Sequence, residues 1–365
     1  MSDTTSHPHP LAVLTSGGDA PGMNAAVRAV VKVAASRGTP VVGVEGGYTG
    51  LLAGRLRPLT SEDGGALTPD PEIDFAATMG GTTLGSAREP RFVTADGRAP
   101  ALGVLERLSG LVVIGGNGSL AGAHALAAES KTPVVGIPAS IDHDVGCTGT
   151  SIGVDTALNT IVSCCDRISD TARAHRRAFV VEVMGRDSGY LAMAGAVAAG
   201  ADAVLFGEQG RDEATIVAAV EAAIRRAFGV AGKRRVLIVK AEGVTIPCTA
   251  LVRQLDERLS DLPEVGVRAT VLGHLVRGGS PSFQDRMVAG RLGLAAVDAI
   301  RDGVSDVMAA WQAPRGKGER TPDPHVTRVP LADVLAESRA LIDGTSEITK
   351  WRVAMMEQLE GVFGL

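Results

Sequence analysis

Short runs of apolar residues alternate along the chain with longer segments in which apolar positions recur at a helical period. The first apolar run covers residues 11–15 and is followed by a loop that contains glycine and proline. After this loop, a period of 3.6 residues puts four apolar side chains on one face of a predicted helix: Val27, Val30, Val31 and Ala34. We interpret the stretch as a buried strand, a tight loop and an amphipathic helix.

This unit of strand, loop and helix recurs through both halves of the chain. Further buried strands are expected at 111–114, 133–137, 178–183, 203–206, 236–241 and 269–276. Helices are expected at 190–199, at 216–228, in a segment that ends near residue 300, and around 355–359, with a Pro- and charge-rich surface loop at 313–324. Because parallel strands are joined by right-handed crossovers, the pattern predicts an α/β fold with a parallel sheet.

The composition agrees with this class and bounds the size of the fold. With 365 residues, 45% of them hydrophobic, the chain supports a large core and about two domains. Aromatic residues make up only 3%, so the core must be built from Val, Leu, Ile and Ala. The 46 glycines fall mostly at the ends of apolar runs, where tight turns between strand and helix need them.

Charge and sorting signals argue against several classes of protein. The net charge is −5 and Lys and Arg form no block, so we expect neither nucleic acid nor a membrane as a partner. No apolar run is long enough to span a membrane and the first ten residues show no signal peptide, so a cytoplasmic location is expected. Without C-x-x-C spacing, the four cysteines are expected to be reduced: Cys147, Cys164, Cys165 and Cys248.

The loop after the predicted strand 133–137 carries the strongest chemical signal. Residues 139–144 read ASIDHD, with two carboxylates two positions apart. Loops at the carboxyl ends of parallel strands line the crevice in which α/β proteins bind ligands. Asp142 and Asp144 are therefore candidates for a general base and a metal ligand, although Asp-rich loops also serve as turns and helix caps.

Two glycine-rich loops follow predicted strands and are suited to bind phosphate through backbone N–H groups. Residues 16–24, SGGDAPGMN, have the glycine spacing of a P-loop, but Met23 and Asn24 stand where Lys and Ser or Thr are required. Residues 116–121, GNGSLA, fit the dinucleotide-binding pattern G-x-G-x-x-A, although no acidic residue ends the next strand. An NAD-dependent oxidoreductase is therefore an alternative from a different class, which a titration with NADH would test.

Basic side chains near glycine loops and strand ends favour a phosphorylated substrate. Residues 80–88 form a glycine loop that ends in Arg88, whose planar guanidinium is suited to a phosphate. Five further basic residues flank predicted strand ends in the second half: Arg177, Arg186, Arg268, His274 and Arg277. Each alone is compatible with a solvated surface charge, but together they are what a phosphorylated sugar requires.

Seven segments between Ser16 and Pro281 form one ordered set. They read SGGDAPGMN, GGTTLGSAR, GGNGS, SIDHD, VEVMGR, AEG and LGHLVRGGSP. In their sequences and in their order, these segments resemble one family over nearly the whole chain. This family is 6-phosphofructokinase of the bacterial type. The resemblance implies a glycolytic enzyme that phosphorylates the 1-hydroxyl of fructose 6-phosphate with ATP and Mg²⁺, giving fructose 1,6-bisphosphate and ADP.

The resemblance also implies how the chain is organised. We expect two Rossmann-like three-layer α/β/α domains with mainly parallel sheets and the active site in the cleft between them. The nucleotide-binding domain is expected at 1–153 plus 276–310, and the fructose 6-phosphate-binding domain at 154–275 plus 311–365. Active sites that share residues between subunits imply a homo-oligomer, typically a tetramer.

Catalysis, by this resemblance, centres on Asp142. It is the general base that takes the proton from the 1-hydroxyl as that oxygen attacks the γ-phosphoryl group. Arg186 and Arg88 offset charge on the moving phosphoryl group, and Mg²⁺ bridges the outer phosphates. Ser140 replaces the family's usual Thr and keeps the hydroxyl, and Asp144 keeps the second carboxylate.

The remaining site residues resemble the family's contacts to two ligands. Contacts to fructose 6-phosphate are expected from Ser140, Asp144, Met184, Gly185, Arg186, Glu242, His274 and Arg277, with Arg177 and Arg268 lent by a neighbouring subunit around the 6-phosphate. Nucleotide contacts are expected from Gly18, Tyr48, Arg88, Gly116, Asn117, Gly118 and Ser119.

Two positions distinguish ATP from pyrophosphate as the phosphoryl donor in this family. Pyrophosphate enzymes place Asp at the position of Gly118 and Lys at the position of Ala139, which fills the adenosine space and adds a cation for the shorter donor. Both residues are small in this chain. ATP is therefore the expected donor, and a pyrophosphate-dependent enzyme is the alternative.

Asn117 departs from the family pattern at a metal position. The family usually has an Asp there, which helps to hold Mg²⁺. Because Mg²⁺ prefers carboxylates and phosphates, Asp144 and the ATP phosphates must supply more of its ligands, and metal affinity should fall.

The effector site of bacterial relatives is matched only in part. Ser169 and residues 60–61 lack the Arg that is typical there, which removes charge-assisted hydrogen bonds to a diphosphate. We therefore expect weak or absent control by ADP and phosphoenolpyruvate. Other members of the basic and acidic cluster are present: Arg28, Lys32, Lys233 and Glu208.

Overall fold

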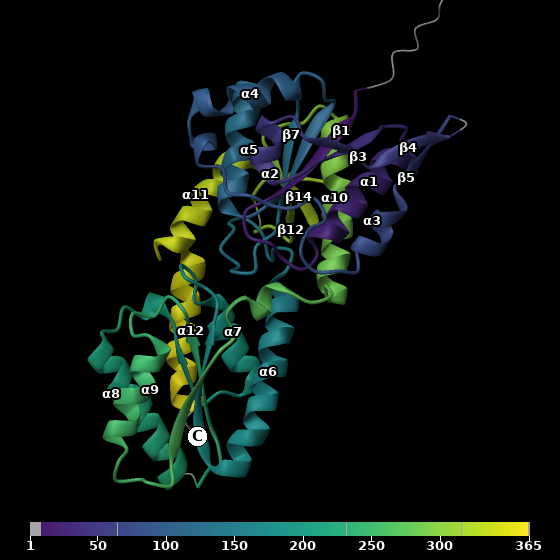
Figure 1. The fold of residues 1–365 in the computed structure, drawn as a ribbon. Coiled ribbons are helices and arrows are strands. Elements are labelled where there is room, and N and C mark those ends of the chain that lie inside the picture. Colours follow the sequence, from purple (N-terminus) through teal and green to yellow (C-terminus); the bar gives the residue numbers. More distant parts are fainter. Residues whose placement is uncertain (1–8, 64, 231, 315, 364–365) are drawn as a thin grey trace, which may run out of the picture. The chain divides into compact units, whose positions relative to one another are not determined.

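The chain forms two compact units in a computed structural model that describes residues 9–363 except 64, 231 and 315 (Figure 1). Unit 1 comprises the described residues up to Ile141, then Val145–Asp155 and Arg277–Arg339. Unit 2 comprises Asp142–Asp144, Thr156–Val276 and the described residues from Ala340 onward. The three residues that carry both carboxylates of the ASIDHD loop thus pack with unit 2.

Unit 1 is built on an eight-stranded mixed sheet. Its strands are β1 (Leu11–Ser16), β2 (Val41–Val44), β3 (Leu56–Pro58), β6 (Gly110–Gly115), β7 (Val134–Pro138), β12 (Val307–Trp311), β13 (Glu319–Arg320) and β14 (Val326–Pro330). Their order is β13-β14-β12-β7-β6-β1-β2-β3, parallel from β12 to β2 and antiparallel at both edges. A separate hairpin pairs β4 (Thr60–Asp63) with β5 (Ala66–Pro69).

Helices cover both faces of this sheet. They are α1 (Met23–Ser36), α2 (Gly47–Leu52), α3 (Pro71–Ala76), α4 (Ala95–Leu105), α5 (Asn117–Glu129), α10 (Phe283–Arg301) and α11 (Leu331–Ile342). Leu111 and Val113 of β6 belong to a buried cluster with side chains of α2, α4, α5 and α11. Because side chains alternate along a strand, Gly110 faces the opposite way, where a Cβ would touch Ile300 of α10.

Unit 2 is built on a four-stranded parallel sheet in the order β11-β8-β10-β9. The strands are β8 (Arg177–Val183), β9 (Ala203–Leu205), β10 (Val236–Ala241) and β11 (Gly266–Val271), and the helices are α6 (Val154–His175), α7 (Tyr190–Ala199), α8 (Glu213–Arg225), α9 (Cys248–Arg258) and α12 (Glu347–Phe363). Figure 1 shows α8 and α9 side by side along this sheet. Every residue of β10 is buried, as expected of a strand that is covered on both faces of the sheet.

The predicted fold class is confirmed, since both sheets are mainly parallel and alternate with helices along the chain. The strands expected at 11–15, 111–114, 133–137, 178–183, 203–206 and 236–241 are β1, β6, β7, β8, β9 and β10. The free thiols of all four cysteines agree with the predicted reduced state. Within the described residues, no helix combines the length and the apolar character that crossing a membrane requires.

Two predictions about boundaries need correction. The strand expected at 269–276 ends at Val271, because its partner β8 ends at Val183, and a 3-10 helix, Gly273–Arg277, follows. Residues 311–339 belong to unit 1 and not to the second domain. The reason is strand pairing, since β14 pairs with β12 and β12 pairs with β7 in the sheet of unit 1.

Candidate active site

Three loops of unit 1 leave its sheet at one edge. Ser16 pairs with Gly115, and Gly115 pairs with Pro138, so the carboxyl ends of β1, β6 and β7 lie side by side. The loops that start there are SGGDAPGMN, GNGS and ASIDHD. Ser140 lies beside the second loop, because a Cβ on Gly116 would be 3.6 Å from the Ser140 Cβ. Three separate sequence signals are thus neighbours at the edge where α/β proteins bind ligands.

Two helix N-termini open at this edge without a side-chain cap. The helix α1 begins after Gly22 and α5 after Gly116, and a glycine has no side chain with which to cap the N–H groups of the first turn. Apart from its chain neighbours and the nearby backbone of α5, no described atom lies within 4 Å of the position that a Cβ on Gly118 would take. Free N–H groups and the positive end of the helix dipole suit this edge to phosphate oxygens.

Asn24 connects the loop at 80–88 to the SGGDAPGMN loop. Its Nδ2 donates to the Gly80 carbonyl at 3.3 Å, and its Oδ1 accepts from the Thr83 N–H at 2.8 Å. The Ser86 hydroxyl donates to the Gly17 carbonyl at 2.5 Å. Asn24 therefore holds two phosphate-suited loops together, which explains why this position carries an amide and not the hydroxyl of a P-loop. Arg88 follows as an exposed side chain.

Tyr48, one of the expected nucleotide contacts, is buried beneath α5. Its ring stacks on Phe92 with centroids 3.9 Å apart, and its hydroxyl donates to the Ser119 carbonyl at 2.6 Å. Burial raises the pKa of Tyr48, so the phenol stays protonated. With 5% of its surface exposed, Tyr48 presents no open ring face and supports Ser119 in the first turn of α5.

Arg277 lies over the SGGDAPGMN loop. Its Nη1 donates to the Asp19 carbonyl at 3.3 Å, and a Cβ on Gly18 would overlap the guanidinium. Gly18 is therefore small so that a cation can approach the phosphate-suited backbone. The resemblance assigns Arg277 to the sugar phosphate, whereas this structure places its guanidinium at a loop assigned to the nucleotide.

Three strand ends of unit 2 converge in the same way. Val183 of β8 pairs with Ala241 of β10, and Glu182 pairs with Val271 of β11. The Glu242 N–H then donates to the Val183 carbonyl at 2.9 Å. Five predicted sugar contacts follow these strand ends and lie at one edge of the sheet: Met184, Gly185, Arg186, Glu242 and His274.

Two glycines allow the loops of this edge to lie close together. Gly185 has φ +123°, and a Cβ there would overlap the Ser188 carbonyl. A Cβ on Gly243 would overlap the Arg186 carbonyl. Only glycine fits either position, which accounts for the glycines of the VEVMGR and AEG motifs.

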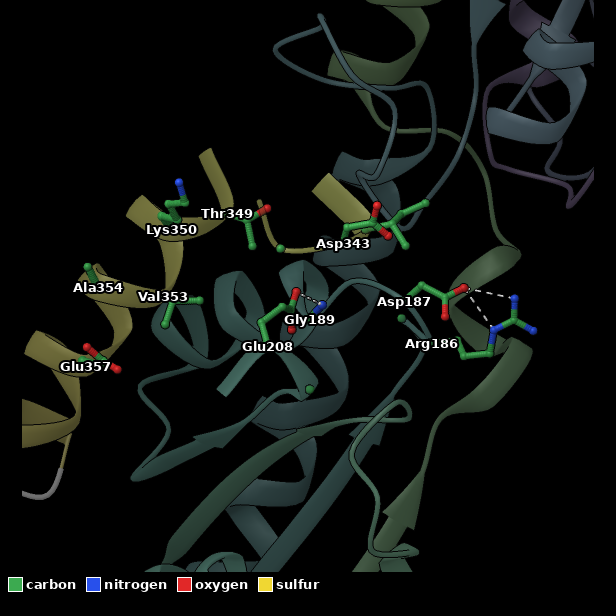
Figure 2. A pocket seen from close by; sticks show the side chains of 14 residues that line it. Arg186, Asp187, Gly189, Glu208, Asp343, Thr349, Lys350, Val353, Ala354 and Glu357 are labelled. Carbon is green, nitrogen blue, oxygen red and sulfur yellow. Dashed lines mark hydrogen bonds and ion pairs between the residues drawn. The ribbon is translucent and has the colours of Figure 1, made fainter. Parts of the chain in front are cut away.

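Arg186 lies among three carboxylates. Its Nε and Nη2 donate to Asp187 Oδ2 at 3.1 and 3.0 Å, as Figure 2 shows. The hydrogen bonds that Arg186 donates to Asp187 are the largest cause that raises the pKa of Arg186, and the charges of Glu242 and Asp142 add to it. Asp142, Arg186 and Glu242 therefore share one electrostatic environment in unit 2. Asp187 was not predicted, and its only signal is an acidic residue directly after the VEVMGR motif.

His143, between the two carboxylates of the ASIDHD loop, is a buried residue with φ +51°. Burial is the main cause that lowers its pKa to about 3, and the charge of Arg352 adds to the effect. The ring is thus neutral at neutral pH. Asp142 and Asp144, by contrast, are half-buried.

Arg177 and Arg268 lie at the other end of the sheet. Arg177 is the first residue of β8, and Arg268 pairs with Phe179 near the start of that strand. Seven residues of strand span about 20 Å. The two arginines therefore lie away from the strand-end loops of their own unit.

Unit 2 also contains a cavity of about 550 Å³, shown in Figure 2. Loops at Gly185–Gly189 and Gly207–Glu208 line it together with the end of α11 and one face of α12. Four carboxylates outnumber its two cations, so the cavity is unsuited to an anionic sugar phosphate. The charged lining residues are Asp187, Glu208, Asp343, Glu357, Arg186 and Lys350.

The described residues contain no group of three or more His, Cys, Asp or Glu side chains that would hold a metal ion. The two predicted ligands are Asp144 in unit 2 and Asn117 in the first turn of α5 in unit 1. Each supplies one oxygen-bearing side chain. Such a sparse set fits Mg²⁺ only when substrate phosphates complete its shell.

Four similarities to known proteins cover most of the chain. The sequence pattern of the family described as Phosphofructokinase matches residues 10–300. The ATP-dependent 6-phosphofructokinase of Thermotoga petrophila is 42% identical over 333 residues, 91% of this chain and 95% of that protein. The ATP-dependent 6-phosphofructokinase 1 of Thermus thermophilus is 43% identical over 301 residues, 82% of this chain and 88% of that protein. Among solved structures, phosphofructokinase from Saccharomyces cerevisiae matches 95% of this chain at 30% identity with a TM-score of 0.77, and this chain spans 48% of that longer one.

Proposed function

The chain belongs to the phosphofructokinase family, and on this premise we propose that it transfers the γ-phosphoryl group of ATP to the 1-hydroxyl of fructose 6-phosphate. The products are fructose 1,6-bisphosphate and ADP. The observation that carries the proposal is the shared environment of Asp142, Arg186 and Glu242 in unit 2. A carboxylate base near a guanidinium is what phosphoryl transfer to a hydroxyl needs.

Asp142 removes the proton from the attacking 1-hydroxyl in this proposal. Arg186 turns from Asp187 toward the transferred phosphoryl group and offsets its charge, and Arg88 adds a second guanidinium. Glu242 and His274 bind sugar hydroxyls. Asp187 keeps the exposed Arg186 side chain near the strand ends until the substrate is bound.

The ATP phosphates bind at the starts of α1 and α5, where Gly116 and Gly118 present no side chain and Gly18 lets the Arg277 guanidinium approach. Mg²⁺ would supply positive charge that neutralises the phosphates. Asp144 and Asn117 would hold it, with Asp144 as the only charged protein ligand of the two.

The 6-phosphate of the sugar needs cations beyond those at the strand ends. We propose that Arg177 and Arg268 bind it in a neighbouring subunit, because both lie at the far end of the sheet from their own loops. The active enzyme is then a homo-oligomer, and a tetramer by family resemblance.

The test is a coupled assay of fructose 6-phosphate with ATP and with pyrophosphate in parallel. We expect turnover with ATP and at least a hundredfold lower kcat/KM with pyrophosphate, since the space at Gly118 stays open for a nucleotide. Turnover with pyrophosphate but not with ATP would show that pyrophosphate is the phosphoryl donor. No turnover with either compound would contradict the kinase proposal. An NADH titration should leave the absorbance of the cofactor unchanged.

Replacement of Asn117 by Asp should strengthen the binding of Mg²⁺. A second carboxylate favours Mg²⁺, so the Mg²⁺ concentration for half-maximal activity should fall about threefold or more. The measurement is the activity at fixed ATP over a Mg²⁺ series, with calorimetric titration of Mg-ATP as a binding control. Unchanged metal dependence and ATP saturation would show that Asn117 does not limit metal binding.

Control by ADP or phosphoenolpyruvate should be weak. The expected effector-binding cations are already paired within the chain, Arg28 and Lys32 with Asp74 at 2.5 and 2.7 Å and Lys233 with Asp202 at 2.7 Å. The hydrogen bonds from Lys32, first, and Arg28 lower the pKa of Asp74, so it keeps its negative charge.

The fructose 6-phosphate concentration for half-maximal activity should therefore shift less than twofold when either effector is added. The variant Asp74→Asn releases Arg28 and Lys32 and should increase any response to ADP. Sigmoidal saturation of the wild type that ADP relieves would contradict this prediction.

A further inference from the structure

One aromatic ring joins the loop of Asp142 to the C-terminal helix. The ring centroid of His143 lies 4.3 Å from that of Tyr190, with the two planes tilted by 50°. The guanidinium of Arg352 in α12 lies over the same Tyr190 ring, with its Cζ 4.5 Å from the centroid. Tyr190 is therefore shared by two segments of unit 2 that are more than 200 positions apart in sequence.

His143 depends on this packing for its orientation. Its side chain is only 7% exposed, and its Nδ1 has no hydrogen-bond partner among the described residues. Its left-handed backbone, φ +51°, is one that a residue with a side chain keeps only where the surroundings enforce it. Contacts such as that with Tyr190 must supply this constraint.

Tyr190 is itself held next to the Arg186 loop. It is the first residue of α7, and the preceding Gly189 N–H donates to Glu208 Oε1 at 2.7 Å, as Figure 2 shows. Arg186 is four residues earlier in the same loop. Tyr190 therefore contacts the loop that contains Asp142 and also stands at the end of the loop that contains Arg186.

We propose that Tyr190 and Arg352 are positioning residues that hold the ASIDHD loop so that Asp142 stays directed at the sugar hydroxyl. The proposal rests on the proposed kinase function. A general base acts only within hydrogen-bond reach of its proton, and small misplacements of reacting groups lower the rate strongly. Through Arg352, α12 becomes part of the scaffold of the active site.

The test compares the full-length variants Tyr190→Leu and Arg352→Met with the wild type in steady-state kinetics. Both should lower kcat about tenfold and change KM for fructose 6-phosphate less than twofold. The reason is that the orientation of Asp142 toward the hydroxyl proton affects the transition state strongly and substrate binding only a little. Tyr190→Phe keeps the ring, and Arg352→Lys keeps the charge, so both should recover most of kcat. The matched control Trp351→Ala, at the adjacent 62%-exposed position of α12, should leave kcat unchanged.

Hydrogen exchange of a peptide covering residues 139–146 gives a readout that does not need activity. Exchange should rise in Tyr190→Leu and Arg352→Met but not in Trp351→Ala. Unchanged kcat and exchange in both variants, or an equal loss in Tyr190→Phe, would overturn the proposal. If Tyr190→Leu does not fold, the pair Arg352→Met and Arg352→Lys decides by the same criteria. A wild type without kinase activity refutes the proposed function, and the exchange data then decide the positioning role separately.

Discussion

Replacement of Asp142 by Asn should lower kcat by a factor of about 10²–10⁴, the range that a positioned general base contributes. The amide is nearly isosteric with the carboxylate but accepts no proton, so KM for fructose 6-phosphate should change little. The charge of Asp142 acts on Arg186 within unit 2, which supports its place beside the transferred phosphoryl group. The measurement is the coupled assay with ATP at saturating Mg²⁺.

The matched control for this prediction is Asp144→Asn, two residues away in the same loop. If the two carboxylates divide their roles as proposed, Asp144→Asn should raise the Mg²⁺ requirement more than it lowers kcat at saturating Mg²⁺. Full activity of Asp142→Asn would contradict the mechanism, and equal kcat losses in both variants would contradict the division of roles.

Replacement of Lys240 by Met should lower the free energy of unfolding by about 3–5 kcal/mol. Lys240 lies in the centre of the sheet of unit 2 and is 1% exposed, with its Nζ 2.8 Å from Glu182 Oε2 and 3.1 Å from the Ala241 carbonyl. Its removal leaves the Glu182 carboxylate, 18% exposed, without its cation. Urea unfolding followed by circular dichroism measures the effect.

Two further variants separate this buried pair from an ordinary ion pair. The double variant Lys240→Met with Glu182→Leu removes both charges and should regain most of the lost stability, because an apolar pair of similar size avoids the desolvation cost. Arg225→Met breaks exposed pairs with Asp261 and Glu221 and should lower the free energy of unfolding far less, because solvent screens both pairs. A loss in Lys240→Met no larger than in Arg225→Met would show that the buried charge of Glu182 is well solvated.

The central βα units were predictable because their signals are local. Strands such as β1 and β6 contain continuous apolar runs and are followed by glycine, and α7 was predicted with its exact ends. The edge strands β3 and β13 were missed, and so was β14, which pairs with β13. They are short and partly exposed, and their partners alone define them as strands.

The candidate site could be proposed from the sequence where family motifs coincide with strand ends, as for Asp142, Arg186 and Glu242. It was not predictable where a residue acts through a distant partner. Asp187 and Glu208 are ordinary acidic residues in the sequence, and only the fold shows that one holds Arg186 and the other holds the start of α7. In the sequence, Lys240 interrupts an apolar strand without an evident reason. The strand register shows the reason, because it pairs Lys240 with Glu182.

The hydrophobic period, the glycine turns and the sequence motifs therefore determine the α/β class and the central βα units and nominate the main candidate site residues, because these features act within a few positions of the chain. The assignment of 311–339 to unit 1, the burial of Tyr48 and the contacts of Tyr190 with His143 and Arg352 are decided by the tertiary structure alone. The physical reason is that strand pairing and side-chain packing join residues far apart in sequence, and no local pattern records which distant partner completes a buried surface.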